Sequence, residues 1–268
     1  MDKRFSLELF LLLSLKEYCM YCRTVLVVGC LFLLFAAGCS KEAASSADAA
    51  SGTGKGGSMA RFTISGNHLY LADWTSLRVF DITDPSLPVE KPRVNVGFGV
   101  ETIFPYKDKL FIGSSAGMYV YSIANPAAPA KLGSVLHLRA CDPVVSNDTI
   151  SYVTLQGSAR CGPAESGLYI YDIKNISTPS LLKLLPLYSP YGLGLVDSVV
   201  FVCQGNNGLT AINIKKPTDP KIMYTKNDGE YMDVIPYDNM LICYVKTGLM
   251  IYDISDLRNI SKVGEINN

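Results

Sequence analysis

A phrase that recurs five times along the chain constrains the fold more than any other feature. It reads LRVFDITDPSLP at 77–88, and its copies begin at residues 118, 168, 209 and, in a degraded form, 249. Equivalent positions are separated by steps of 41, 50, 41 and 40 residues. A period of about 40 residues built from short strands is typical of a propeller or a repeat array, in which no unit buries its apolar face alone.

Each copy has the pattern of two strands joined by a tight turn. The first strand is a run such as LYLAD (69–73) or LFIGS (110–114), and the second contains LRVFDI or its equivalent. The turn position holds Ser76 in the first copy and Gly in the other four. Glycine there favours a left-handed backbone position that side chains resist.

A short polar residue ends the second strand in every copy and marks the repeat. The five marker residues are Asp81, Ser122, Asp172, Asn213 and Asp253. Each has a side-chain acceptor that can bind backbone N–H groups of the following turn. Because a catalytic carboxylate is not interchangeable with Ser or Asn, we interpret the marker as a turn cap.

Two more strands complete each unit, as PRVNVG (92–97) and VETIFPY (100–106) show after the first copy. We name the four strands of a unit a, b, c and d in chain order. Five such units without a helical pattern predict an all-β fold, a five-bladed β-propeller over residues 59–268, and four strands per unit make a solenoid less favourable.

The stretch LYLADWTSLRVFDITDPSLP (69–88) resembles the LVIVD repeat of bacterial surface and secreted proteins. The resemblance extends over about residues 60–266 and is weakest in the fifth copy, where Leu257 and Ile260 replace the two prolines. It implies a propeller and a location outside the cytoplasm, but it implies no particular reaction.

The N-terminal region has the features of a secretory signal. VLVVGCLFLLFAAGCS (25–40) is a short apolar run that ends in small residues. Its Ala36-Ala37-Gly38-Cys39 ending resembles the lipobox of bacterial lipoproteins, which implies cleavage before Cys39 and a diacylated sulfur. A retained transmembrane anchor is the alternative. A second apolar stretch lies upstream, so Met20 is a candidate translation start.

We therefore divide the chain into a signal region (1–38), a flexible lipidated tether (39–58) and the propeller (59–268). The tether is rich in Ala, Ser and Gly and has no apolar periodicity. Ser40 after the lipidated position favours the outer membrane, on either its periplasmic side or the cell surface. The formal net charge is zero, which argues against nucleic-acid binding.

Four of the eight cysteines lie beyond the signal and lipobox. Cys203 and Cys243 share one repeat position in strand b and are expected in the core. Cys141 begins a strand a and Cys161 lies in the enlarged third b-to-c loop, so both fall on one face of one blade. We predict a disulfide between them in an oxidising compartment, with two free thiols as the alternative. The ACDPVV…YVTL…CG pattern also resembles a variant among LVIVD-repeat lipoproteins.

The same face, where b-to-c and d-to-a connections emerge, contains the candidate functional residues. Its candidate binding residues are Trp74, Phe98, His137, Arg139, Arg160, Tyr188, Tyr191 and Tyr231, a mixture enriched at protein interfaces. Neither histidine of the chain, His68 or His137, has a spaced ligand partner, so no metal or cofactor is implied.

An enzymatic alternative uses three carboxylates near the starts of strands a. They are Glu101, Asp142 and Asp233, and five-bladed glycosidases place three acids in such a region. Asp142 precedes Pro143, however, so turn formation explains it equally well. We expect a lipid-anchored, non-catalytic propeller that binds a protein or a glycan, with a carbohydrate-active hydrolase as the alternative.

Overall fold

The computed structural model describes residues 56–137, 143–157 and 162–268. All the described residues belong to one compact unit, which spans residues 51–268. This unit is built from strands and turns, and no helix in its described residues has the length and hydropathy to cross a membrane.

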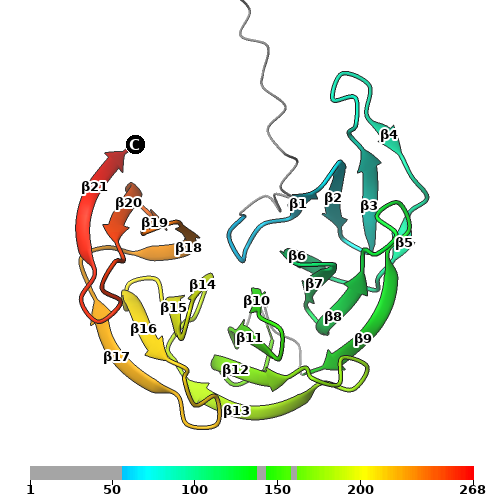
Figure 1. Cartoon of the computed structure of the whole chain (residues 1–268). Coiled ribbons are helices and arrows are strands. Elements are labelled where there is room, and N and C mark those ends of the chain that lie inside the picture. The colour runs from blue at the N-terminus through cyan, green and yellow to red at the C-terminus, as the bar shows by residue number, and fades with distance from the viewer. Residues whose placement is uncertain (1–55, 138–142, 158–161) are drawn as a thin grey trace, which may run out of the picture. The chain divides into compact units, whose positions relative to one another are not determined.

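The strands form five antiparallel sheets that follow one another along the chain, so the predicted five-bladed propeller is confirmed. Figure 1 shows strand a of each blade on the inside and strand d on the outside. The strands are β1 (Phe62–Ser65), β2 (His68–Asp73), β3 (Ser76–Asp81), β4 (Val89–Glu90) and β5 (Val94–Asn95) in blade 1; β6 (Val100–Tyr106), β7 (Lys109–Ser114), β8 (Gly117–Ser122) and β9 (Ala130–Leu136) in blade 2; β10 (Val144–Ser146), β11 (Ile150–Leu155), β12 (Gly167–Asp172) and β13 (Ser180–Pro186) in blade 3; β14 (Leu193–Val196), β15 (Val199–Cys203), β16 (Leu209–Asn213) and β17 (Lys221–Lys226) in blade 4; and β18 (Tyr231–Tyr237), β19 (Met240–Val245), β20 (Gly248–Asp253) and β21 (Ser261–Asn267) in blade 5.

The outer strand distinguishes blade 1 from the other four. Its strand d is split into β4 and β5, which pair separately with β3. In blades 2 to 5 strand d is continuous, and its pairing with strand c shifts register at one repeat position, just before the marker. The shift lies at Val120/Tyr121, Ile170/Tyr171, Ala211/Ile212 and Ile251/Tyr252.

All five marker residues are turn caps, as predicted. In each copy the side-chain oxygen accepts a hydrogen bond from the backbone N–H two residues later. The donor–acceptor distance is 3.0 Å from Thr83 to Asp81 and 3.1 Å from Ala124 to Ser122. Asp, Ser and Asn are therefore interchangeable at the marker because each presents an oxygen at the same place.

The repeated turn glycines are required chiefly by close packing. A Cβ at Gly117, Gly167, Gly208 or Gly248 would lie 1.9–2.5 Å from a carbonyl oxygen of strand d. Gly208 and Gly248 have a left-handed φ, of +88° and +141°, whereas Gly167 does not. A left-handed backbone therefore explains glycine at only some of these turns. The close contact with a carbonyl oxygen of strand d explains glycine at all four.

The apolar core lies between neighbouring blades. Four clusters of buried side chains join blades 1 and 2, 2 and 3, 3 and 4, and 4 and 5. Tyr70 and Val79 of blade 1, for example, belong to one cluster with Ile103 of blade 2. Cys203 and Cys243 are fully buried in the cluster between blades 4 and 5, which confirms their predicted place in the core.

Candidate functional site

The b-to-c and d-to-a connections lie on one face of the propeller, as the strand order predicted. Backbone hydrogen bonds join them: Thr75 O accepts from the N–H groups of Val96 and Gly97, and Ala116 O accepts from His137. We call this surface the loop face, formed among the described residues by His137, Pro143 and 74–75, 96–99, 115–116, 156–157, 162–166, 187–192, 204–208, 227–230 and 246–247.

Trp74 and Phe98 form an exposed aromatic pair on the loop face. Trp74 follows β2 in the b-to-c turn of blade 1, and Phe98 lies in the connection from β5 to β6. Their ring centroids are 5.2 Å apart with an interplanar angle of 80°, an edge-to-face geometry that aromatic rings favour. Trp74 is 46% exposed and Phe98 63% exposed. The structure thus brings together two of the predicted binding residues and leaves both accessible.

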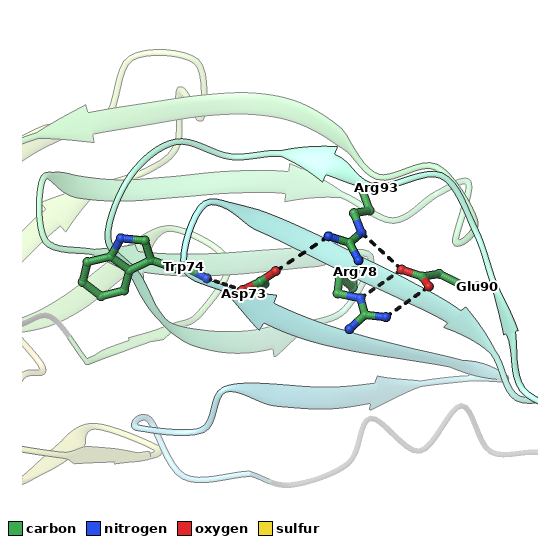
Figure 2. A network of polar contacts seen from close by, with 5 residues as sticks. All are labelled: Asp73, Trp74, Arg78, Glu90 and Arg93. Atoms are coloured by element: carbon green, nitrogen blue, oxygen red, sulfur yellow. Dashed lines mark hydrogen bonds and ion pairs between the residues drawn. The ribbon is translucent and has the colours of Figure 1, made fainter.

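A chain of polar contacts holds the turn that carries Trp74 (Figure 2). The Trp74 backbone N–H donates to Asp73 Oδ1 at 2.9 Å, and the Asp73 carboxylate lies 3.9 Å from the Arg93 guanidinium. Arg93 Nε also donates to Glu90 Oε1 at 3.3 Å. Arg78 donates two hydrogen bonds to the Glu90 carboxylate, at 2.9 and 3.0 Å. This bidentate geometry is directional, so it positions the side chains as well as pairing the charges.

The ion pairs among Asp73, Arg78, Glu90 and Arg93 are accessible to solvent, so each contributes little to stability. We therefore assign them the role of orienting the turn that carries Trp74. Arg78 also lies 4.9 Å from the centre of the Phe80 ring, which restricts its side chain further. The hydrogen bonds from the Arg78 guanidinium hold the pKa of the Glu90 carboxyl below its usual range. The carboxylate therefore stays ionised and keeps both arginines in place at neutral pH.

The other predicted binding residues lie in different surroundings. Tyr188 is almost fully exposed and His137 is half-buried. Tyr191 is half-buried and packs on the core between blades 4 and 5, facing Gly205. Arg139 and Arg160 lie outside the described residues, and so do Cys39 and the predicted Cys141–Cys161 disulfide, which stays a prediction.

Tyr231 does not belong to an exposed binding face, contrary to its predicted role. Its side chain is fully buried, and its hydroxyl donates to Asp228 Oδ1 at 2.6 Å. The Tyr252 hydroxyl donates to the other oxygen of Asp228, at 2.8 Å. Burial raises the pKa of Tyr231 far above its usual range. Tyr231 is therefore a structural residue of blade 5.

Asp233 is engaged by the segment that precedes β1. Ser58 Oγ donates to Asp233 Oδ1 at 3.2 Å and accepts from the Leu193 N–H at 2.7 Å. A Cβ at Gly57 or Gly192 would lie 2.1 Å from a carboxylate oxygen of Asp233, so both glycines make room for it. Burial raises the Asp233 pKa to about 6, although hydrogen bonds from Val234, Ser58 and Met59 oppose the shift.

Ser58, the last residue of the tether as the sequence divides the chain, is also buried and packs against the propeller. We call residues 56–60 the strap. It reaches blades 2, 4 and 5, because Ile103 N–H donates to Ala60 O in addition to the contacts of Ser58 with Leu193 and Asp233.

The proposed catalytic carboxylates do not share a repeat position. Glu101 is half-buried on β6, and counting from the markers its equivalent in blade 5 is Met232. The equivalent of Asp233 in blade 2 is Thr102. Asp142 lies outside the described residues, so the catalytic set stays a prediction. Within the described part of the chain, no group of three or more His, Cys, Asp or Glu side chains is placed to hold a metal ion.

Sequence reasoning missed a central cavity of about 390 Å³. Its walls are mostly apolar and come from the inner strands of blades 2 to 5 and from the strap. The lining residues are Gly56, Ser58, Phe104, Pro105, Val145, Leu193, Gly194, Leu195, Val196, Asp197, Val234, Pro236 and Asp238. The available signal was the matching FPY (104–106) and IPY (235–237) endings of two strands a, which place a proline at the same end of each.

Comparisons with known proteins agree with this architecture. Residues 56–96 match the LVIVD repeat family. No curated protein matches the sequence. A protein from Lactobacillus plantarum is 12% identical with a TM-score of 0.58, and the match covers 75% of this chain and 68% of that one.

Two further structures share the fold. BamB from Moraxella catarrhalis is 10% identical with a TM-score of 0.53, over 70% of this chain and 56% of that one. Apo AztD from Citrobacter koseri is 11% identical with a TM-score of 0.52, over 76% and 62% of the two chains. This chain therefore spans 56–68% of the length of the three structures. At these identities the likeness shows the fold alone.

Proposed function

We propose that this chain, an LVIVD-repeat β-propeller, is a non-catalytic binding protein of the bacterial cell envelope. It binds a protein or glycan partner through the loop face, with Trp74 and Phe98 as its anchors. The observation that carries the proposal is the exposed aromatic pair on a turn held by a chain of ion pairs.

Rigid aromatic side chains suit this role because little conformational freedom is lost when they are buried by a partner. Trp and Arg are enriched among the residues that dominate binding energies at interfaces, and Arg78 and Arg93 lie in the same network as Trp74. The Trp74 O also accepts the Val100 N–H at 3.0 Å, so the turn is attached to the next blade. The anchor is thus positioned before binding, which lowers the entropic cost of association.

The surroundings of Asp233 support a non-catalytic function. Its carboxylate accepts hydrogen bonds from the strap. It also occupies the space that a Cβ at Gly57 or Gly192 would need. These contacts explain a buried carboxylate without substrate. Were the hydrolase alternative correct, the purified chain would cleave a glycan and Asp233→Asn or Glu101→Gln would abolish the cleavage.

Truncation of the aromatic pair tests the binding function. Trp74→Ala should weaken partner capture from envelope extracts by about 1–3 kcal/mol, the range expected for an interface anchor. The matched control is Leu87→Ala, which removes an exposed apolar side chain from the c-to-d turn of the same blade. Binding to a glycan array, measured in parallel, distinguishes a glycan from a protein partner. Equal capture by the parent and Trp74→Ala would contradict the proposal.

We place the protein at the outer membrane through a lipid on Cys39, because Ala36-Ala37-Gly38-Cys39 ends the apolar run of the signal region. Cys39→Ser should abolish acyl labelling and release the chain from membranes, which fractionation and labelling with a fatty-acid analogue measure. Ser40→Ala serves as the neighbouring control. A parent chain that stays in membranes without incorporating label would exclude the lipid anchor.

A further inference from the structure

The central cavity opens on the side of the propeller opposite the loop face. Figure 1 shows the inner strands β6, β10, β14 and β18 around the centre, and the cavity lies among them. Its lining residues lie mostly toward the ends of these strands, as Phe104 and Pro105 of β6 and Pro236 of β18 do. The a-to-b turns that follow emerge with the c-to-d turns on what we call the turn face. The cavity is therefore a candidate site separate from Trp74 and Phe98.

The strap lies at the deep end of the cavity. Ser58 lines the cavity and is fully buried, and so are Leu193 and Val234 among the other lining residues. The Ser58 hydroxyl donates to Asp233 at 3.2 Å and accepts from the Leu193 N–H at 2.7 Å. Because the fold already engages this hydroxyl, the deep end offers chiefly apolar surface to a ligand.

Two prolines make the side walls poor in hydrogen-bond donors. Pro105 and Pro236 occupy the same place in blades 2 and 5, since each pairs with the leucine that follows the first residue of strand b, Leu110 or Leu241. Proline has no backbone N–H, so neither position can donate a hydrogen bond to an anionic group in the cavity. The walls therefore favour an apolar occupant over an anion.

The open end of the cavity is acidic. Among the lining residues, charge comes from Asp197 and Asp238, which lie exposed in the a-to-b turns of blades 4 and 5. Their φ angles are left-handed, at 49° and 50°, a conformation that Asp tolerates. The turn does not require a carboxylate, however, because Lys107 holds the same position in blade 2 with a φ of 53°. Lys107 itself is paired with Asp148 of blade 3.

A cavity of about 390 Å³ with apolar walls and few polar groups has the size and character of a small-molecule site. We infer that it binds a small organic cation, a molecule with an apolar body and a protonated amine at one end. The body lies against Phe104, Val145 and Leu195, and the ammonium group lies at the mouth beside the two carboxylates. An anion of the same shape would meet charges of its own sign there.

Three probes built on one apolar skeleton test this preference for charge. At neutral pH phenylbutylamine is a cation, phenylbutanol is neutral and phenylbutyric acid is an anion. Titration calorimetry of the full chain in lipid nanodiscs, corrected with empty nanodiscs, gives the three Kd values. The amine should bind about tenfold more tightly than the alcohol, since it pairs with accessible carboxylates, and the acid should bind most weakly.

Two neutral variants locate the charge that is recognised. Asp197→Asn and Asp238→Asn should each weaken binding of the amine by about fivefold and leave the alcohol unchanged. Asn also tolerates a left-handed backbone, so both turns should keep their conformation. Asp84→Asn is the matched control, because Asp84 is exposed in a c-to-d turn on the same face and does not line the cavity.

A filled cavity tests where the apolar body binds. Leu195→Trp adds volume inside the cavity and should weaken binding of all three probes, with circular dichroism as the check that the variant folds. The inference is overturned if the parent binds none of the probes, if the amine and the acid bind equally, or if both Asn variants bind the amine like the parent. Trp74→Ala should bind the amine unchanged, so this site and partner capture by the loop face are tested separately.

Discussion

At the scale of single residues, Asp233 shows how the propeller uses a buried carboxyl group. It lies among backbone N–H groups and the Ser58 hydroxyl, and the glycines at 57 and 192 admit it. Burial raises its pKa to about 6. Protonated Asp233 is therefore better tolerated in the folded chain than the ionised form, which makes stability depend on pH.

The dependence has a definite sign. A carboxyl group whose pKa is raised on folding contributes stability fully below its unfolded value of 3.8, and this is lost as pH rises through about 6. The free energy of unfolding of the parent, relative to Asp233→Asn, should therefore fall by at most about 3 kcal/mol between these pH values. Denaturant unfolding at several pH values measures it. Asp197→Asn, at an exposed turn, controls for loss of a carboxylate, and parallel parent and Asp233→Asn profiles would refute the assignment.

Tyr231 illustrates what residue patterns did not reveal. The sequence predicts Tyr231 among the loop residues of the binding face, whereas it is the first residue of β18 and its side chain is fully buried. The pairing of β18 with β19 shifts register between Tyr231 and Asp233, and β6 has the same irregularity between Val100 and Thr102. An extra residue in a strand changes which side chains face the core. Both Tyr231 and Val100 are consequently buried, which alternation alone does not predict.

At the scale of elements, the turn between strands b and c depends on its glycine. Gly208 has a φ of +88°, and a Cβ there would lie 2.1 Å from the Lys226 carbonyl oxygen of β17. Replacement must therefore strain the turn and separate strand d from strand c.

Gly208→Ala should lower the free energy of unfolding by about 1–3 kcal/mol. Ser76→Ala is the matched control because blade 1 already accommodates a Cβ at this repeat position, and it should cost less. Urea unfolding of the two variants and the parent gives the comparison. A Gly208→Ala chain as stable as Ser76→Ala would mean that strand d moves aside without cost.

The elements themselves were largely predictable because the repeat shows each one five times. Some features depend only on local sequence, so their residue types predict their geometry. These are strands b and c, the turn glycine and the marker. Strand d of blade 1 was not predictable in detail, since its two prolines and Arg93 give no sign that it divides into β4 and β5. The central cavity was missed for a related reason, because it depends on how inner strands from four blades converge.

At the scale of the whole molecule, the number of blades followed from the repeat, but the inequality of the blades did not. Among the residues that the structure describes, blades 2, 3 and 4 share a core cluster with a neighbour on each side, whereas blades 1 and 5 share one on a single side. The copies are too similar in sequence to show which of them lack a second neighbour. Their difference becomes visible only in the exposure of equivalent residues such as Tyr244 and Ala72.

This inequality predicts how the propeller opens. In repeat proteins stability is a sum of intrinsic and neighbour terms, so a unit with one interface opens more readily than a unit with two. Amide hydrogens of β19 and β20 in blade 5 should therefore exchange faster than the equivalent amides of β11 and β12 in blade 3 when the chain is monomeric. Both pairs are central strands of their sheets, so edge position does not separate them.

Hydrogen exchange followed by mass spectrometry measures the difference, with β7 and β8 of blade 2 as a second internal reference. Equal protection of blades 3 and 5 in the monomer would show instead that blades 5 and 1 stabilise each other within one chain.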